Sequence, residues 1–420
     1  MEYIARLKEF QPNVRKFVVG QLLVGLGMTF WGLFFNLYLA SLGMDKSQIG
    51  SVLALSNIAT ALFAIPAGVL SVRGSLRHLL VVAQLISTIS YVAAVMVGNS
   101  YWLFVFVFLA AGFATVSRVV SGPFIMANST ARERGYIFST TFLTGYVGGI
   151  VGFVFAGILR SHLTTVVASP EQGYRFAIMG GMMLSLAGVV PFFFIRNSSP
   201  KNGEHVLPEQ TGVHSFTYRT FLKLDWTFLA RALVPVVFIS AGAGVIVQFM
   251  NLYFKEVFSL SDDVIGYLMA AQAVTTSLGV LVSPMLAERL GRVPTVVFTQ
   301  LASIPFMVWM GLTRSVLMAQ FCFIVRAALM NMAGPVSNTM MMELAKREEQ
   351  GVLNALMVCL QSGAWAFSAW LYGHVLRGNY PKSFLIAAVL YAFASVSYFG
   401  FFNKLERRKA LREPGQSLGK

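Results

Sequence analysis

Two arginines lie deep within long apolar runs, where a fixed positive charge is costly. Arg118 is the only charged residue between Tyr101 and Asn128, and Arg326 stands in the run CFIVRAALMNMAGP. A guanidinium group is a planar fork of donors, so it can bind an anionic group through two hydrogen bonds. It can equally hold backbone carbonyls or a tyrosine hydroxyl and organise its helix bundle. We favour anion binding for Arg326 and an organising or coupling role for Arg118.

The composition indicates a polytopic membrane protein. The chain has 420 residues, of which 56% are hydrophobic and 12% are charged, whereas soluble domains carry about 25% charged residues. Cys322 and Cys359 both lie in apolar runs and are predicted to be buried free thiols. The five histidines lack ligand spacing. We therefore predict no metal site, no cofactor and no enzymatic activity.

Twelve segments are long and apolar enough to cross a bilayer as helices, which requires about 20 residues. The predicted spans are 17–41, 49–70, 78–98, 101–127, 136–159, 175–195, 228–254, 263–286, 293–313, 315–342, 351–376 and 382–402. The polar segment 196–227 divides them six and six. The sequence thus predicts an all-α membrane protein.

Lysine and arginine predict the orientation. With both termini cytosolic, the cytosolic segments hold 23 of the 32 basic residues and the opposite side holds seven. This bias also explains the net charge of +15 without a nucleic-acid partner. The predicted parts are a cytosolic tail (1–16), a six-helix bundle (17–195), a cytosolic linker (196–227), a second six-helix bundle (228–402) and a cytosolic tail (403–420). We expect a monomer in a bacterial inner membrane or plasma membrane.

The two halves of the sequence repeat each other. The stretch NLYLASLGMDKSQIG, which begins at Asn36, returns as NLYFKEVFSLSDDVIG at Asn251, 215 residues later. The Ile-Gly pair within it returns after 216 residues, and so does the glycine of ARERG in REEQG. A fixed offset near half the chain length indicates two related bundles. Parallel repeats of six spans are a transporter architecture, in which two bundles rock about a central site.

The loop between the second and third helices of each half carries a specific motif. Residues 284–292 read PMLAERLGR, with Glu288 followed by Arg289 and Arg292. Residues 68–77 read GVLSVRGSLR, which keeps Arg73 and Arg77 but has no acidic residue before Arg73. Both stretches, and nearly the whole chain, resemble the major facilitator superfamily, whose pattern is roughly Gly-x-Leu-Ala-Asp-Arg-x-Gly-Arg.

The resemblance implies a twelve-helix transporter that works by alternating access between two pseudo-symmetric bundles. It also implies that this loop forms a charge-assisted latch on the cytosolic side. Glu343 is the predicted partner of the second-half arginines, and a solvated helix-end charge is the alternative. The missing acid leaves the first-half latch incomplete.

The sequence indicates the subclass of transporter less specifically than the family. The stretch RVVSG at Arg118 resembles a drug–proton antiporter signature, Arg-x-x-Gln-Gly, with Ser121 in place of glutamine. We expect drug-type efflux first, and an organic-anion or lipid-like carrier second. A receptor or scaffold without flux ranks below both. No Asp or Glu lies deep in a span, so protons, uniport and exchange all stay open as coupling modes.

Polar and aromatic residues near the middle of the spans complete the predicted solute site. They could contact a small amphipathic or anionic solute, or form hydrogen bonds between helices. Besides the two arginines, the candidates are Asn57, Gln248, Gln272, Asn331, Tyr146, Gln361 and Trp365.

Overall fold

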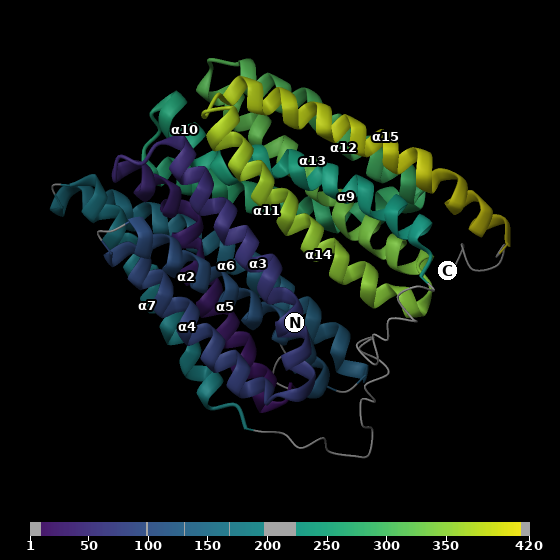
Figure 1. Ribbon diagram of the computed structural model, residues 1–420, viewed down its shortest axis with the longest axis horizontal. Coiled ribbons are helices and arrows are strands. Elements are labelled where there is room, and N and C mark those ends of the chain that lie inside the picture. The colour runs from purple at the N-terminus through teal and green to yellow at the C-terminus, as the bar shows by residue number, and fades with distance from the viewer. Residues whose placement is uncertain (1–9, 98–99, 130, 168, 197–223, 413–420) are drawn as a thin grey trace. The chain divides into compact units, whose positions relative to one another are not determined.

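The protein is helical throughout the residues that the computed structural model describes, 10–97, 100–129, 131–167, 169–196 and 224–412 (Figure 1). The first helices are α2 (Pro12–Ser41), α3 (Lys46–Arg73), α4 (Leu76–Met96), α5 (Ser100–Ala127), α6 (Ala131–Val166) and α7 (Pro170–Phe193). After the linker come α9 (Trp226–Ile246), the 3₁₀ turn η2 (Val247–Phe249), α10 (Met250–Phe258), α11 (Asp262–Leu290), α12 (Arg292–Leu312), α13 (Val316–Leu344), α14 (Arg347–Trp370), the π-helical turn η3 (Leu371–Val375) and α15 (Tyr380–Arg412).

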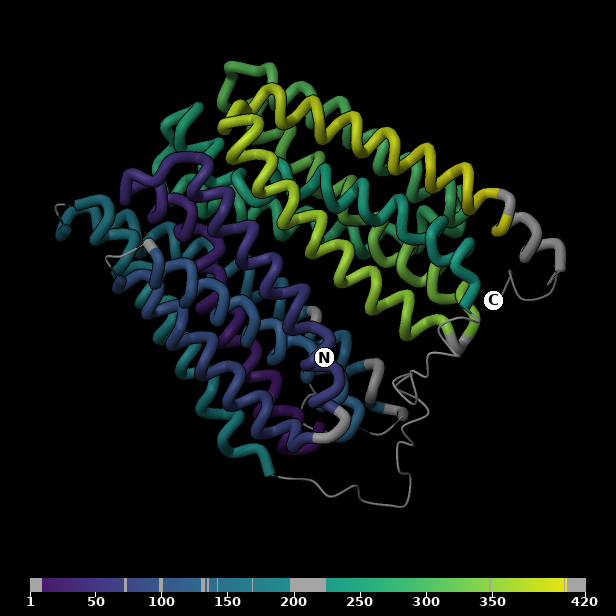
Figure 2. Tube along the Cα trace, viewed as in Figure 1, coloured from purple at the N-terminus to yellow at the C-terminus, as the bar shows by residue number. Residues whose placement is uncertain are grey.

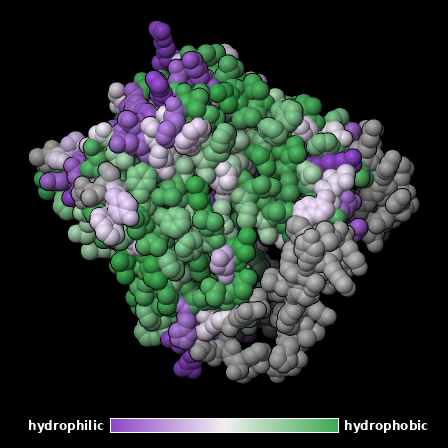
Figure 3. All heavy atoms as spheres, viewed as in Figure 1, coloured by the Kyte–Doolittle hydropathy of each residue, from purple (hydrophilic) through white to green (hydrophobic). Residues whose placement is uncertain are grey.

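Within these ranges, twelve helical segments are long and apolar enough to span a membrane. Large apolar side chains face outward along them, including Leu62, Leu281 and Leu317, which are 58%, 71% and 78% exposed. On the face drawn in Figure 3, apolar residues cover the sides of the helices and hydrophilic residues gather toward helix ends. Lipid tails must cover such a surface in place of water. The predicted twelve-helix, all-α membrane fold is confirmed.

Local signals start the helices where the apolar runs begin. Asp45 and Gln48 form a capping box at α3: the Gln48 backbone amide donates to Asp45 Oδ1 at 2.8 Å, and the Asp45 amide donates to Gln48 Oε1 at 3.0 Å. Pro12 occupies the first turn of α2, where no amide hydrogen is needed. Several helices extend beyond the predicted spans because their polar ends continue the helix; α6 is the clearest case.

The contacts divide the chain into two compact units. The first unit is Met1–His214 with Phe249–Ala273, and the second is Ser215–Gln248 with Val274–Lys420. The sequence placed all of 228–402 in the second bundle, whereas the structure groups α10 and the first part of α11 with the first unit. Asn251 gives one reason, because its amide nitrogen donates to Leu33 O at 2.8 Å and its Oδ1 accepts from Asn36 at 3.2 Å.

The packing inside each unit follows one pattern. In the first unit α2 packs against α7 and α6, while α4 packs against α5 and α7. In the second unit α9 packs against α15 and α14, while α12 packs against α13 and α15. Each pair in the second list is the sequence repeat of a pair in the first. The repeated packing agrees with two pseudo-symmetric bundles.

Glycines allow α2 and α7, whose Cα traces are drawn in Figure 2, to pack backbone against backbone. A Cβ added at Gly27 would lie 2.3 Å from Gly181 O, and one at Gly20 would lie 2.8 Å from Gly188 O. Close approach through small residues is a standard way for helices to associate in a membrane. Helices α2 and α7 are therefore closely packed in the first unit, and α2 also lines the cavity described next.

Candidate functional site

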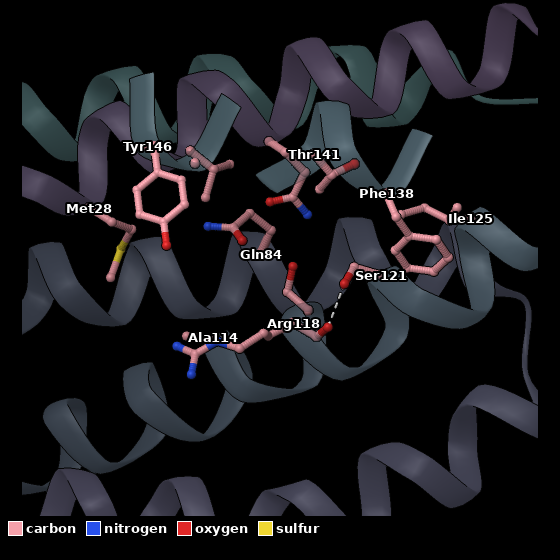
Figure 4. A pocket seen from close by; sticks show the side chains of 13 residues that line it. Met28, Gln84, Ala114, Arg118, Ser121, Ile125, Phe138, Thr141 and Tyr146 are labelled. Carbon is pink, nitrogen blue, oxygen red and sulfur yellow. Dashed lines mark hydrogen bonds between the residues drawn. The ribbon is translucent and has the colours of Figure 1, made fainter. Parts of the chain in front are cut away.

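A cavity of about 720 Å³ lies inside the first unit. Helices α2, α4, α5 and α6 surround it (Figure 4). Besides Arg118, its hydrogen-bonding side chains are Gln21, Gln84, Ser117, Ser121, Thr141 and Tyr146. Its apolar lining is Val24, Met28, Ala114, Ile125 and Phe138, with Gly145 at the wall. The volume falls in the range of ordinary small-molecule sites, roughly 300–1,000 Å³.

Arg118 supplies the charge of this cavity. Its side chain is exposed although the residue lies in the middle of α5. Its backbone oxygen accepts a hydrogen bond from Ser121 Oγ at 2.6 Å. Among the described residues, none forms a hydrogen bond or an ion pair with its guanidinium. In Figure 4 that group and the Tyr146 hydroxyl face the same part of the cavity, so an anionic group placed there would find an unpaired cation.

Hydrogen bonds hold the side-chain amide of Gln84 in place at the cavity wall. It is buried, and its amide nitrogen donates to Thr88 Oγ1 and to Ser185 Oγ, both at 3.2 Å. The bond to Ser185 joins α4 to α7, and the two bonds together fix the orientation of the amide. The described lining contains no Asp or Glu, so the cavity combines one cation, a few hydrogen-bonding groups and soft apolar walls.

Arg326 has a different environment. It is 3% exposed and lies in the second unit, on α13. Its Nη2 donates to the Tyr391 hydroxyl at 3.1 Å, and its guanidinium carbon lies 6.0 Å from the centre of the Tyr391 ring. Its Nε is buried without a hydrogen-bond partner among the described residues. This contact with a tyrosine is the one expected of an arginine that organises its bundle.

The other predicted site residues are scattered. Of them, the structure places only Tyr146 in the cavity with Arg118. Asn57 and Asn331 each donate to a carbonyl of their own helix, at 2.8 Å. Gln248 donates to Gly244 O at 3.0 Å and to Trp365 O at 3.2 Å within the second unit. Two further candidates are placed more simply: Gln272 is half-buried in the first unit and Gln361 is exposed in the second.

The predicted cytosolic latch residues divide by unit. In the second unit Arg292 Nη1 lies 2.6 Å from Glu343 Oε2, with both side chains more than 40% exposed. An exposed pair of this kind contributes about 0–1 kcal/mol. Glu288 and Arg289 are exposed. In the first unit Arg77 donates to Phe193 O at 2.6 Å, at the end of α7. The side chain of Arg73 lies outside the described residues.

The sequence reasoning missed several lining residues. Gln21 and Gln84 are uncharged polar residues inside apolar spans, the same signal that selected Asn57 and Gln272. That signal identifies polar residues in a membrane span but does not give the direction in which each faces. The direction in which each side chain faces depends on its position around the helix and on the neighbouring helices.

Comparisons with known proteins now give the family. The profile described as Major Facilitator Superfamily matches residues 17–261 and 233–419. The chain therefore belongs to this superfamily; it is a secondary transporter of the membrane and not an enzyme. No curated protein matches the sequence.

Solved structures share the fold at low sequence identity. A bacterial homologue of the human lysosomal transporter Spinster aligns with a TM-score of 0.74 and 15% identity, covering 96% of this chain and 97% of that one. The nucleoside transporter NupG aligns at 0.73 and 14%, covering 93% and 99%. The D-xylose–proton symporter aligns at 0.70 and 17%, covering 93% and 97%. At such identities the likeness concerns the fold.

Proposed function

We propose that this transporter carries a small organic anion with an apolar body, and that Arg118 binds its anionic group. The observation that carries the proposal is the exposed guanidinium at a cavity of about 720 Å³ with no acidic residue in its described lining. A guanidinium binds carboxylate or phosphate oxygens through two parallel hydrogen bonds. Met28 and Phe138 offer adaptable apolar contacts for the rest of the solute.

Drug-type efflux is the second candidate, supported by the RVVSG stretch and by the apolar lining. An organic cation would have to bind beside Arg118 without a described carboxylate to attract it. The anion carrier is therefore favoured. We further propose that the protein works as a monomer by alternating access, with both termini in the cytosol.

Purified protein tests the proposal without knowledge of the natural solute. The probes are aryl carboxylates, alkyl phosphates and the cation tetraphenylphosphonium, each tested for a shift in thermal unfolding and for uptake into liposomes. A ligand that binds the folded state raises the unfolding temperature. We expect at least one anion to bind and move. Uptake with and without an imposed pH gradient then decides whether protons are coupled.

Three variants make the test specific. Arg118→Gln should weaken anion binding by about tenfold or more, since a charge-assisted bond is worth about 1.5–3 kcal/mol. Arg118→Lys keeps the charge but loses the planar fork, and should lie between wild type and Arg118→Gln. Arg314→Gln, which removes an exposed arginine in the loop between α12 and α13, is the matched control. Binding of the cation alone, unchanged in Arg118→Gln, would favour drug-type efflux and overturn the anion proposal.

A further inference from the structure

A buried carboxylate lies at one end of the first unit, away from the cavity. Asp262 is the first residue of α11 and its side chain is 5% exposed. This end, called the far end below, also holds the last residues of α2, α6 and α10, Ser41, Val166 and Phe258. A carboxylate that is buried to this degree needs partners, because an unpaired buried charge is strongly unfavourable.

Three groups from three helices meet this carboxylate. Lys255 Nζ of α10 lies 2.7 Å from Asp262 Oδ1, and the Tyr174 hydroxyl of α7 donates to the same oxygen at 3.0 Å. Arg160 Nε of α6 lies 3.5 Å from Asp262 Oδ2 and is also buried, at 5% exposure. The Arg160 guanidinium stacks over the Tyr174 ring at 4.3 Å. Asp262 thus joins α11 to two helices of the first half.

The backbones of α6 and α11 approach each other closely beside this ion pair. A Cβ added at Gly266 would lie 2.7 Å from Phe153 O, and one at Gly157 would lie 3.0 Å from Asp263 Cα. Helices α6 and α11 therefore approach through glycines within about a turn of the ion pair. A Cβ at Gly173 would lie 2.8 Å from the Arg160 guanidinium, so the guanidinium packs directly on the backbone of α7 at this glycine.

Other contacts between α10 and the helices of the first half of the chain are weaker. Lys46 and Glu256 form an ion pair between α3 and α10, but their side chains are 25% and 35% exposed. Asn36 and Asn251 contribute neutral hydrogen bonds. The cluster of Asp262, Arg160, Tyr174 and Lys255 is more deeply buried, because the side chains of Asp262 and Arg160 are both 5% exposed, whereas Lys255 is 35% exposed. Removal of Asp262 would leave the buried Arg160 guanidinium without its acidic partner.

We propose that this cluster is a latch that holds α10 and the start of α11 on α6 and α7, and that the transport cycle breaks and remakes it. The segment Phe249–Ala273 belongs to the second sequence repeat but packs in the first unit. Alternating access requires the repeats to separate at one end and then at the other. Separation at the far end must pull Asp262 away from Arg160 and Tyr174, whereas Lys255 lies on the same segment and moves with it. Asp262 is therefore a positioning residue for the cycle.

Spin labels at Leu42 and Val257 measure the opening directly. These residues lie at the ends of α2 and α10 and are 38% and 47% exposed. Both would be replaced by cysteine in a background with Cys322→Ala and Cys359→Ser. Pulsed electron paramagnetic resonance then gives the fractions with short and long label distances, in the absence of any solute.

Asp262→Asn should raise the ratio of long to short distances at least tenfold, a change of about 1.4 kcal/mol. Arg160→Gln should do the same, and the double variant should add little to either, because both remove one interaction. Asp263→Asn, the neighbouring acid on the same turn, is the matched control and should leave the distances unchanged. A wild-type distance distribution in Asp262→Asn would overturn the latch.

A milder variant replaces Asp262→Asn in the test if that variant does not fold. If Asp262→Asn does not elute as a single species, Tyr174→Phe removes one hydroxyl and keeps the ring under Arg160. It should raise the long-distance fraction by a smaller factor, and no change would again overturn the latch. The proposal rests on the transport cycle but not on the solute, because failure of Arg118 to bind anions would leave these distances as they are.

Discussion

At the scale of residues, a guanidinium inside a membrane is stabilised either by protein groups or by access to a polar space. Arg326 shows the first, since it is buried against Tyr391. Arg118 shows the second, since its guanidinium is exposed at a cavity. The sequence located both arginines but favoured Arg326 for the solute. Depth in a span was readable from the apolar runs, whereas the side on which each arginine faces depends on neighbouring helices.

The Arg326–Tyr391 pair predicts a stability effect. Tyr391→Phe removes the hydroxyl acceptor and leaves a buried guanidinium nitrogen unpaired, so it should destabilise the protein by about 1–3 kcal/mol. Thermal unfolding in detergent measures the loss. In an Arg326→Met background the same substitution should cost clearly less, because the buried donor is gone. Equal costs in both backgrounds would show that the two residues do not interact.

At the scale of elements, glycine contacts fix how the helices pack. In α2, Gly27 meets the backbone of Gly181, whereas Gly25 has open space around it. The sequence predicted the spans because apolar length is a local property. It did not predict the interruption at Val247–Phe249 or the placement of α10. Those features depend on contacts such as Asn251 with Leu33, which join residues more than 200 positions apart.

Two alanine substitutions in one helix separate packing from helix propensity. Gly27→Ala would force α2 and α7 apart, and overpacking of this kind typically costs about 1–3 kcal/mol. Gly25→Ala should be neutral or stabilising by up to about 1 kcal/mol, because alanine favours the helix. Unfolding temperatures of the two variants, compared with wild type, give the answer. Similar destabilisation by both would mean that the α2–α7 contact is not what the glycines serve.

At the scale of the whole molecule, the repeat offset in the sequence predicted that each unit would pack in the same way, and the helix contacts show this agreement. The orientation in the membrane stays a prediction from the placement of lysine and arginine. Its basis is the 23 basic residues on one predicted side against seven on the other.

Thiol labelling tests this orientation. In the cysteine-free background, Leu42→Cys should react with a membrane-impermeant maleimide in intact cells, because the end of α2 is predicted to face outward. Ser75→Cys, at the exposed start of α4, should react only after the membrane is permeabilised. The reverse pattern would place both termini outside.

The continuity of α11 has a mechanical consequence. This single helix runs from Asp262 to Leu290, yet the border between the two units falls inside it, at Ala273–Val274. While the contacts of Asp262 and Gly266 hold the start of α11 on α6, the rest of this helix can follow a motion of the second unit only if α11 bends near the border. The segment Thr275–Thr276–Ser277 follows the border, and hydroxyl side chains can bond to the preceding turn and bend a helix. Amide hydrogen exchange should therefore be faster there than in the first turns of α11, and replacing the three residues with alanine should slow both that exchange and turnover.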